Sequence, residues 1–284
     1  MELDLLETNV SREDKLASLI ADIEDRKIHL SYSSIKAFMK SPRHFLSYKL
    51  KDFVATDAMN EGTLVDMILT EPEKVGRTFG VIPSNCSAST KVGVQAYCDF
   101  FEVANDFAWK DRGAAIEMMK AQSGLIFVTQ AVHDKCHNIA DKVLTNPASA
   151  WILKNAEEKQ ASVNFEAFGW EWKGRMDIHC PDFFTADLKK TKDADPSQFR
   201  HQIKRLRYPL QGAIYNHGKD IPYFIVGYDN DAAVSVIELK QSTLDQEWEY
   251  LARTMDRFNE CVALGEWHKS YDFWPQNHHG IYTY

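Results

Sequence analysis

Two aspartates and a lysine stand close together in the middle of the chain, at Asp177, Asp187 and Lys189. Side chains two residues apart share one face of a strand, so Asp187 and Lys189 are expected to point the same way. A turn at Pro181 and Asp182 would pair their strand with the one that carries Asp177, and would bring the two aspartates together. Like charges at that separation are unfavourable unless a cation lies between them, and magnesium prefers carboxylate and water oxygens.

Lys173 and Arg175 are expected on the same strand face as Asp177. They would face a phosphate group, or else form an ordinary ion pair with Asp177. An ordinary surface hairpin with alternating charges is the alternative to a metal site. The apolar context FFTADL around Asp187 argues against that alternative, because a buried carboxylate without a partner is costly.

The second half of the chain, from about residue 160, has the pattern of a sheet. Turn residues at Gly169 and Pro181 separate three strand-like runs, SVNFEAF, WEWKGRMDIH and FFTADLKK, which predicts a three-stranded meander. Two further runs, IPYFIVGYD and AAVSVIELK, predict a hairpin around Asn230. The meander would carry Asp177 and Asp187 on adjacent strands.

Helical patterns occupy the first half. We expect an N-terminal helix capped by Ser11, two short helices after Leu30 capped by Ser33 and by Ser41, and a helix over residues 57–70. Pro42 suits the first position of the helix after Ser41. The N-terminal half is therefore predicted to be largely helical.

Three further helical regions are expected. Residues 91–158 are mostly helical in pattern, with one start at Asn146, and a later helix carries Leu206, Leu210 and Ile214. The last long helix has an apolar stripe typical of a helix packed on a sheet. That stripe comprises Leu244, Trp248, Leu251, Met255, Phe258 and Val262. The aromatic tail FWPQNHHGIYTY is expected to lie extended over the surface.

These patterns predict an α/β (α+β) protein whose central mixed sheet is flanked by helices. We expect an N-terminal helical appendage over residues 1–29 and a single domain over residues 30–284, with a helical part (30–158) and a sheet-bearing part (159–284). With 44% hydrophobic and 26% charged residues, no apolar run long enough for a membrane span and no secretory signal, the chain is expected to be cytoplasmic.

The net charge of −8 opposes a nucleic-acid partner unless the basic residues are concentrated. Residues 189–207 are such a concentration, although a solvated helix face is the ordinary explanation of a charge run. Seven basic residues fall in that stretch: Lys189, Lys190, Lys192, Arg200, Lys204, Arg205 and Arg207. An acidic chain with one basic stretch is compatible with DNA binding.

The cysteines argue against two kinds of metal centre. All five are single and no CxxC pair occurs, so neither an iron–sulfur cluster nor a structural zinc site is expected. His133, Cys136 and His137 have helical spacing that suits zinc, but a fourth ligand is not apparent nearby, and a solvent-facing helix explains them as well.

Several separated segments, taken in order, resemble RecE-type phage and prophage exonucleases (exodeoxyribonuclease VIII) of the PD-(D/E)-x-K nuclease superfamily. The resemblance runs from about Leu30 to Tyr215. Its segments are LSYSSIKAFMKSPRHFLSYKL, EGTLVDMILTEPEKV, GLIFVTQAVHDKCHNIADKVLTNPASAWIL, KGRMDI, ADLKKT with DADPSQF, and YPLQGAIY. The last three supply the motifs K-x-R-x-D, D-x-K-T and Q-x-x-x-Y in order.

The resemblance implies that Asp177 and Asp187 bind the metal and that Lys189 orients or activates the attacking water. It places Leu188 and Asp66 in the same metal site. Residues implied to support the site or to contact DNA phosphates are Lys173, Arg175, Gln211, Tyr215, Ser33, Arg43, Lys190 and Lys192. Tyr215 fits a core position equally well.

Two positions depart from the family pattern. Asp66 stands where the family has His, and Gln160 stands where it has a Glu. Asp66 is still able to ligate magnesium through oxygen, whereas Gln160 offers only a neutral carbonyl. Glu158 or Glu166 replaces the missing Glu if the alignment is shifted by a few residues.

The resemblance implies a magnesium-dependent exonuclease, with manganese as a substitute metal, in a bacterial or phage-infected cell. It implies digestion of double-stranded DNA ends from 5′ to 3′, leaving 3′ tails for a single-strand-annealing recombinase, by a ring-shaped homo-oligomer (trimer or tetramer). Two alternatives remain: a catalytically impaired relative that binds DNA ends or a partner protein, and an endonuclease of the same superfamily.

Overall fold

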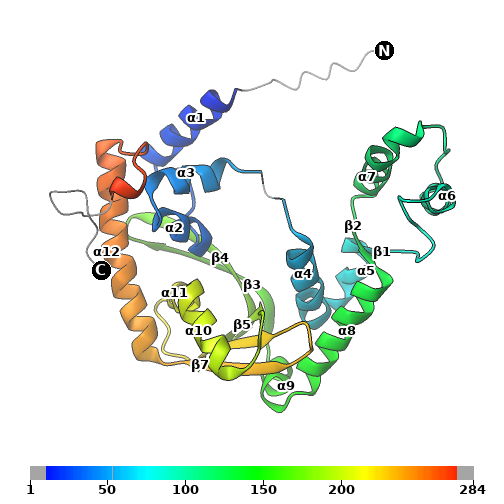
Figure 1. Ribbon diagram of the computed structural model, residues 1–284. Helices are drawn as coiled ribbons and strands as arrows, with labels where there is room; N and C mark the ends of the chain where they lie inside the picture. Colours follow the sequence, from blue (N-terminus) through cyan, green and yellow to red (C-terminus); the bar gives the residue numbers. More distant parts are fainter. Residues whose placement is uncertain (1–10, 53, 274–284) are drawn as a thin grey trace.

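The computed structural model describes residues 11–52 and 54–273, and a five-stranded mixed sheet forms its centre (Figure 1). The predicted meander is confirmed as β3 (Glu158–Ala167), β4 (Trp170–Cys180) and β5 (Phe184–Lys190). The predicted hairpin is confirmed as β6 (Tyr223–Tyr228) and β7 (Val234–Leu239). The strand order is β3-β4-β5-β6-β7, and only the β5–β6 pair is parallel. The α/β class with a mixed sheet flanked by helices is thus confirmed.

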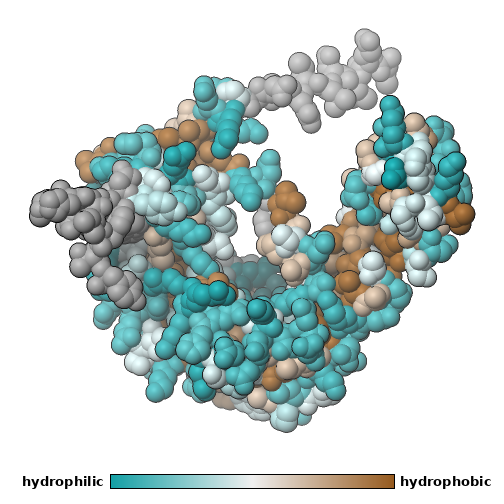
Figure 2. Space-filling view, viewed as in Figure 1, coloured by the Kyte–Doolittle hydropathy of each residue, from teal (hydrophilic) through white to brown (hydrophobic). Residues whose placement is uncertain are grey.

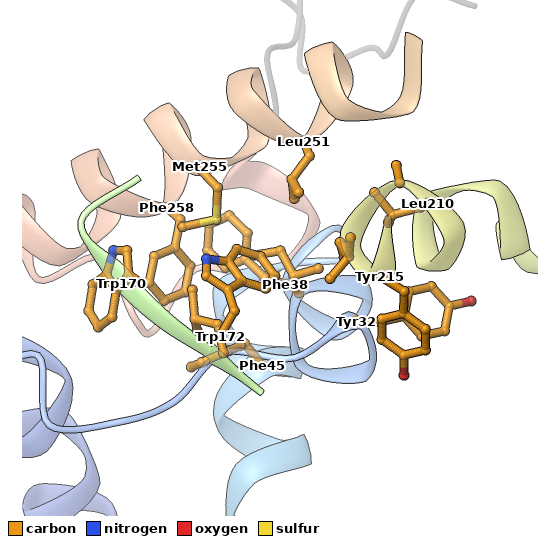
Figure 3. Close-up of a cluster of buried hydrophobic side chains, with 14 of the residues drawn as sticks. Tyr32, Phe38, Phe45, Trp170, Trp172, Leu210, Tyr215, Leu251, Met255 and Phe258 are labelled. Atoms are coloured by element: carbon orange, nitrogen blue, oxygen red, sulfur yellow. The ribbon is translucent and has the colours of Figure 1, made fainter. Parts of the chain in front are cut away.

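One face of the sheet carries an aromatic core. The helices around it are α1 (Arg12–Glu24), α2 (Tyr32–Phe38), α3 (Pro42–Leu50), α10 (Pro196–Leu206), α11 (Tyr208–Tyr215) and α12 (Gln241–Leu264). Figure 3 shows Phe38, Phe45, Trp170, Trp172 and Phe258 gathered beneath α12. All five are buried, and burying an aromatic side chain removes a large apolar area from water. Ile23 of α1 is buried in the same core.

A smaller, mostly aliphatic core lies on the other face. It is covered by α4 (Asp57–Thr70), α8 (Gln130–Thr145) and α9 (Pro147–Lys154), whose buried residues include Leu64, Val65 and Ile139. Beyond α4 and α8 the chain forms a peripheral lobe at the right of Figure 1. Its elements are α5 (Val75–Thr78), β1 (Phe79–Ile82), α6 (Lys91–Phe100), α7 (Arg112–Ser123) and β2 (Ile126–Thr129), with short 3-10 turns at Pro72–Lys74 and Trp109–Asp111.

Most helix starts occur where the sequence predicts them. Ser11 caps α1, Ser41 caps α3 with Pro42 in its first turn, and Asn146 caps α9. The prediction of Ser33 as a cap is wrong, because Ser31 accepts the hydrogen bond from the backbone N–H of Ser34 and Ser33 lies within α2.

Two other predictions need correction. The helix expected to carry Leu206, Leu210 and Ile214 is two helices, since Arg207 between them has a left-handed backbone (φ 60°). The region 91–158 also contains a strand, β2, which pairs in parallel with β1. The paired residues Phe79 and Ile126 are 47 positions apart in the sequence. A four-residue strand with so distant a partner has almost no local signal. The predicted extended tail falls largely outside the described residues.

Within residues 11–52 and 54–273, no helix is both long enough and apolar enough to cross a bilayer.

Candidate active site

Strands β4 and β5 separate at the two aspartates. Pairing between β4 and β5 stops at Ile178 and Ala186, and the next opposed residues are Asp177 and Asp187. The backbone N–H of Leu188 donates instead to Oδ2 of Asp177 (2.8 Å). A side-chain carboxylate thus takes over a strand hydrogen bond, which satisfies a backbone donor that the diverging strands leave without a partner.

The opposite edge of β4 is irregular at the same point. The β3–β4 register omits Gln160 and Asp177, and Gln160 has a left-handed backbone (φ 54°). Met176 belongs to the aromatic core, whereas Ile178, two residues further on, belongs to the aliphatic core. Alternate residues of a regular strand face one side, so β4 changes the face of its side chains at Asp177. Strained backbone of this kind is often found at functional sites.

On the side of the aromatic core, Asp187 has an organised set of partners. The side-chain amide of Gln211 donates to Oδ1 of Asp187 (3.0 Å), and Lys189 forms an ion pair with Oδ2. The Lys189 ammonium also lies 5.2 Å from the centre of the Tyr208 ring. Asp187 is only 2% exposed, so the charge is held almost free of solvent. A buried carboxylate needs such partners.

On the side of the aliphatic core, helix α4 presents Asp66. The hydroxyl of Tyr228, the last residue of β6, donates to Oδ1 of Asp66 (2.7 Å) and to the carbonyl of Gly62 (3.3 Å). These two bonds tie α4 to the sheet. Asp66 is partly exposed and faces a cavity of about 190 Å³, which is lined by Thr63, Asp66, Met67, Thr70, Glu71, Gln160, Arg175 and Asp177. In Figure 2 the surface is hollowed between the α2–α3 side and the α4–α8 side.

Gln160 bridges this cavity. Its side-chain amide donates to Oδ1 of Asp177 (3.3 Å) and to the hydroxyl of Thr70 at the end of α4 (3.4 Å). Glu158 and Glu166, the alternative acidic residues, are paired with His179 and Glu171 on β4, away from Asp177 in the register. Gln160 is therefore the residue opposite Asp177, and it offers Asp177 a donor where a carboxylate would add negative charge.

Ionisation in the site is governed by burial and by the clustered charges. Burial, followed by the charge of Asp177, raises the pKa of Asp66 well above its ordinary value, against the lowering effect of the Tyr228 hydroxyl. Burial also raises the pKa of Asp187 to about 7, although Lys189 opposes the change. Burial lowers the pKa of Lys189, but the charges of Asp187 and Asp177 outweigh it, so that the pKa rises. Lys189 stays protonated at neutral pH.

The donor set suits a hard cation. The charge of Asp177 raises the pKa of Asp66 and of Asp187, and a divalent cation would relieve that repulsion through oxygen ligands. In the part of the chain that the structure describes, no group of three His, Cys, Asp or Glu side chains is already arranged as a metal-binding cluster. Asp66 and Asp177 line the same cavity, so Asp66 would have to move toward the two strand aspartates to complete such a site. The place of Leu188 in it stays a prediction.

The other predicted residues are spread more widely. Lys173 and Arg175 are exposed on β4, and Arg175 lines the cavity together with Asp177. Tyr215 is buried against Gly174, where an added Cβ would come within 2.5 Å of the ring, so the glycine of K-G-R is needed for this close approach. Figure 3 shows Tyr215 beside Tyr32 at the end of the aromatic cluster.

Four basic or polar candidates form no ion pair or hydrogen bond with Asp66, Asp177 or Asp187 within the described residues. Lys190 is paired with Glu61 of α4, which also binds Lys135. Lys192 and Ser33 are exposed, with no contact to the aspartates recorded among the described residues. Arg43 lines a separate groove between α1 and α3.

Sequence reasoning missed Tyr228 and Thr70, because both reach the site from positions distant in the chain. Tyr228 lies 162 residues from its partner Asp66, and Thr70 lies 90 residues from Gln160. A tyrosine at the end of an apolar strand is an ordinary core residue by composition. Only the fold shows that its hydroxyl meets a carboxylate.

Comparison with known proteins agrees with this geometry. None of the curated proteins compared matches the chain. The structure is similar to a crystal structure of a candidate exonuclease from Eubacterium rectale, with a TM-score of 0.55 and 20% sequence identity over 94% of this chain and 88% of that one. Similarity at this identity shows a shared fold. A family model described as "PDDEXK-like domain of unknown function (DUF3799)" matches residues 31–271. The chain therefore belongs to this PDDEXK-like family, within the PD-(D/E)-x-K nuclease superfamily.

Proposed function

We propose that this chain is a magnesium-dependent deoxyribonuclease of the RecE type that hydrolyses phosphodiester bonds at the ends of double-stranded DNA. The observation that carries the proposal is the meeting of Asp177, Asp187 and Lys189 where β4 and β5 separate. In an ordinary structural hairpin the strand hydrogen bonds would be expected to continue past two acidic residues, and a lysine beside them would not be expected to be partly buried. Family membership supports a nuclease with this arrangement.

Asp177, Asp187 and Asp66 are the residues that would hold magnesium, and manganese would substitute. When bound, the ion supplies a Lewis acid and a water of lowered pKa for hydrolysis of the phosphodiester. Gln211 fixes the orientation of Asp187 through its amide, and Leu188 fixes Asp177 through its N–H. Outer partners of this kind typically set ligand geometry in metal sites.

Lys189 acts as a cation and hydrogen-bond donor. Because its pKa is raised, it does not serve as a general base at neutral pH. Its ammonium is held between Asp187 and the Tyr208 ring, where it can orient a water or neutralise a phosphate oxygen. The basic Arg175 on the cavity wall suits a neighbouring phosphate.

The finer parts of the proposal rest on the resemblance to RecE-type enzymes. They are digestion from 5′ to 3′, 3′ tails for a single-strand-annealing recombinase, and a ring-shaped homo-oligomer. A ring would place the basic stretch of residues 189–207 around the DNA and leave an acidic outer surface, which is consistent with a net charge of −8. Steep weakening of DNA binding with salt is then expected.

A catalytically impaired relative that binds DNA ends is the second candidate. The observation that favours it is the Gln160 amide, which donates to Asp177 where a carboxylate ligand is expected. Such a protein would bind duplex ends and release no nucleotides.

The test is release of acid-soluble nucleotides from linear and from closed circular duplex DNA, with magnesium and with EDTA. We expect release from linear DNA with magnesium alone, reduced roughly 10²–10³-fold by Asp187→Asn and by Lys189→Ala. Lys142→Ala, at an exposed lysine of α8, is the control. Wild-type rates in both site variants would refute the assignment, cutting of circles would indicate an endonuclease, and binding without release would favour the impaired relative.

A further inference from the structure

Lys36 of α2 reaches toward the site from the opening segment of the domain. Its ammonium donates to the carbonyl of Leu206 (2.8 Å) and to the hydroxyl of Tyr32 (3.2 Å). Leu206 ends α10, where the chain turns at the left-handed Arg207 into the helix that carries Gln211. Lys36 therefore stands at the junction of α2 with the α10–α11 turn, beside the site already described.

Three cationic side chains gather around the α10–α11 turn: Lys36 at the carbonyl of Leu206, Arg207 in the turn itself, and Lys189 over the ring of Tyr208. Burial lowers the pKa of Lys36, and the nearby positive charges of Lys40, Lys189 and Arg207 lower it further. Arg207 has its own partner in Glu247, and Lys189 has Asp187. For Lys36, no carboxylate partner is recorded within the described ranges. The two acceptors of Lys36, the Leu206 carbonyl and the Tyr32 hydroxyl, are neutral, so a bound anion would further stabilise this half-buried ammonium near other cations.

Lys49 shows what a purely structural lysine looks like in the same fold. Like Lys36, its ammonium donates to a backbone carbonyl, that of His29 (2.8 Å). Each ammonium also lies over an aromatic ring: Lys49 is 5.8 Å from the centre of the Phe45 ring, and Lys36 is 5.3 Å from the centre of the Tyr32 ring. Burial alone lowers the pKa of Lys49, without neighbouring cations. The two lysines therefore differ in the positive surroundings that only Lys36 has.

We propose that Lys36 binds a phosphate of the DNA backbone next to the scissile phosphate, in an anion site between α2 and the α10–α11 turn. This inference rests on the proposed function, since it takes DNA as the substrate. It assigns the phosphate contact of the opening segment to Lys36, whereas Ser33 is exposed and Arg43 lines a separate groove. Lys36 binds substrate and takes no part in the bond cleavage.

The experiment measures DNA affinity with calcium in place of magnesium, using a fluorescent duplex with one recessed end, over a series of salt concentrations. Lys36→Met is compared with Lys49→Met as the matched control. Loss of one phosphate contact should weaken binding by roughly 5- to 10-fold and reduce the slope of log affinity against log salt by about 0.7–0.9. Lys49→Met should leave both affinity and slope unchanged.

Unchanged affinity and slope in Lys36→Met, or an equal change in Lys49→Met, would overturn the inference. Wild-type protein that shows no affinity for the duplex would overturn both the inference and the proposed function. Wild-type protein that binds in calcium but releases no nucleotides in magnesium would refute hydrolysis alone, and the Lys36 comparison would still be decided by the salt slopes.

Discussion

The two sides of the divided sheet hold their acidic residues differently. On the α11 side, Asp187 has an amide donor in Gln211 and an ammonium in Lys189. On the α4 side, Asp66 has the hydroxyl of Tyr228 and faces the charge of Asp177. The first side carries its own compensating positive charge, and the second depends on neutral donors. The contrast indicates that the chain preorganises the Asp187 half of the proposed metal site and leaves the Asp66 half without a paired cation.

On the α11 side, the comparison is tested by removing the amide that donates to Asp187. Gln211→Ala leaves Oδ1 of Asp187 without its hydrogen bond, and loss of an outer partner of this kind should reduce metal affinity or activity about 10–100-fold. Manganese titration by calorimetry and the rate of nucleotide release measure the effect. Gln241→Ala on α12, where the amide pairs with Asp245 at the surface, is the control. Equal, small effects in both variants would show that Gln211 has no such role.

The pH dependence of the unfolding free energy tests the environment of the buried Asp187 carboxyl on the same side. The pKa of Asp187 is about 7 in the folded chain and ordinarily 3.8, so the folded state holds the proton more tightly. The resulting stabilisation is complete below about pH 4 and disappears as pH rises through 7, so the metal-free protein should lose roughly 1–3 kcal/mol of unfolding free energy between pH 5 and pH 8.

Urea unfolding in EDTA at the two pH values measures this change. Asp187→Asn should show a smaller loss than the wild type because it lacks the titrating group. A wild type that gains stability over this interval, relative to that variant, would contradict the assigned pKa.

On the α4 side, the comparison is tested by removing one negative charge and, separately, by adding one. Asp66→Asn should raise the stability of the metal-free protein by about 1 kcal/mol and weaken manganese binding, because it removes one of the mutually repelling carboxylates. Gln160→Glu should do the reverse, lowering stability by about 1 kcal/mol and tightening manganese binding severalfold. Stability shifts of the same sign in the two variants would contradict this account of the α4 side.

The two sides also differed in how well the sequence predicted them. Asp177, Asp187 and Lys189 lie on adjacent strands of one meander, so alternation and a turn at Pro181 were enough to bring them together. Gln211, one turn from Tyr215, followed from the resemblance. The α4 side depends on contacts that span most of the chain, such as Tyr228 with Asp66, and these leave no periodic signal.

The sequence also did not predict the local irregularities of the backbone. Nothing in the residue types marks Gln160 or Arg207 as left-handed, since neither is Gly or Asn. The first distorts β3 opposite Asp177, and the second ends α10 beside Lys36. Lys190, whose role in phosphate binding stays a prediction, forms an ion pair with Glu61 of α4. Tertiary packing decided each of these positions.

A crystal structure with manganese and duplex DNA, using anomalous scattering to locate the metal, tests the central claim most directly. The account predicts a manganese ion bound by oxygens of Asp177 and Asp187, with Asp66 moved toward them and the amide of Gln211 still on Asp187. DNA seated in the cleft with no metal between the two aspartates, or manganese bound only elsewhere on the chain, would contradict it.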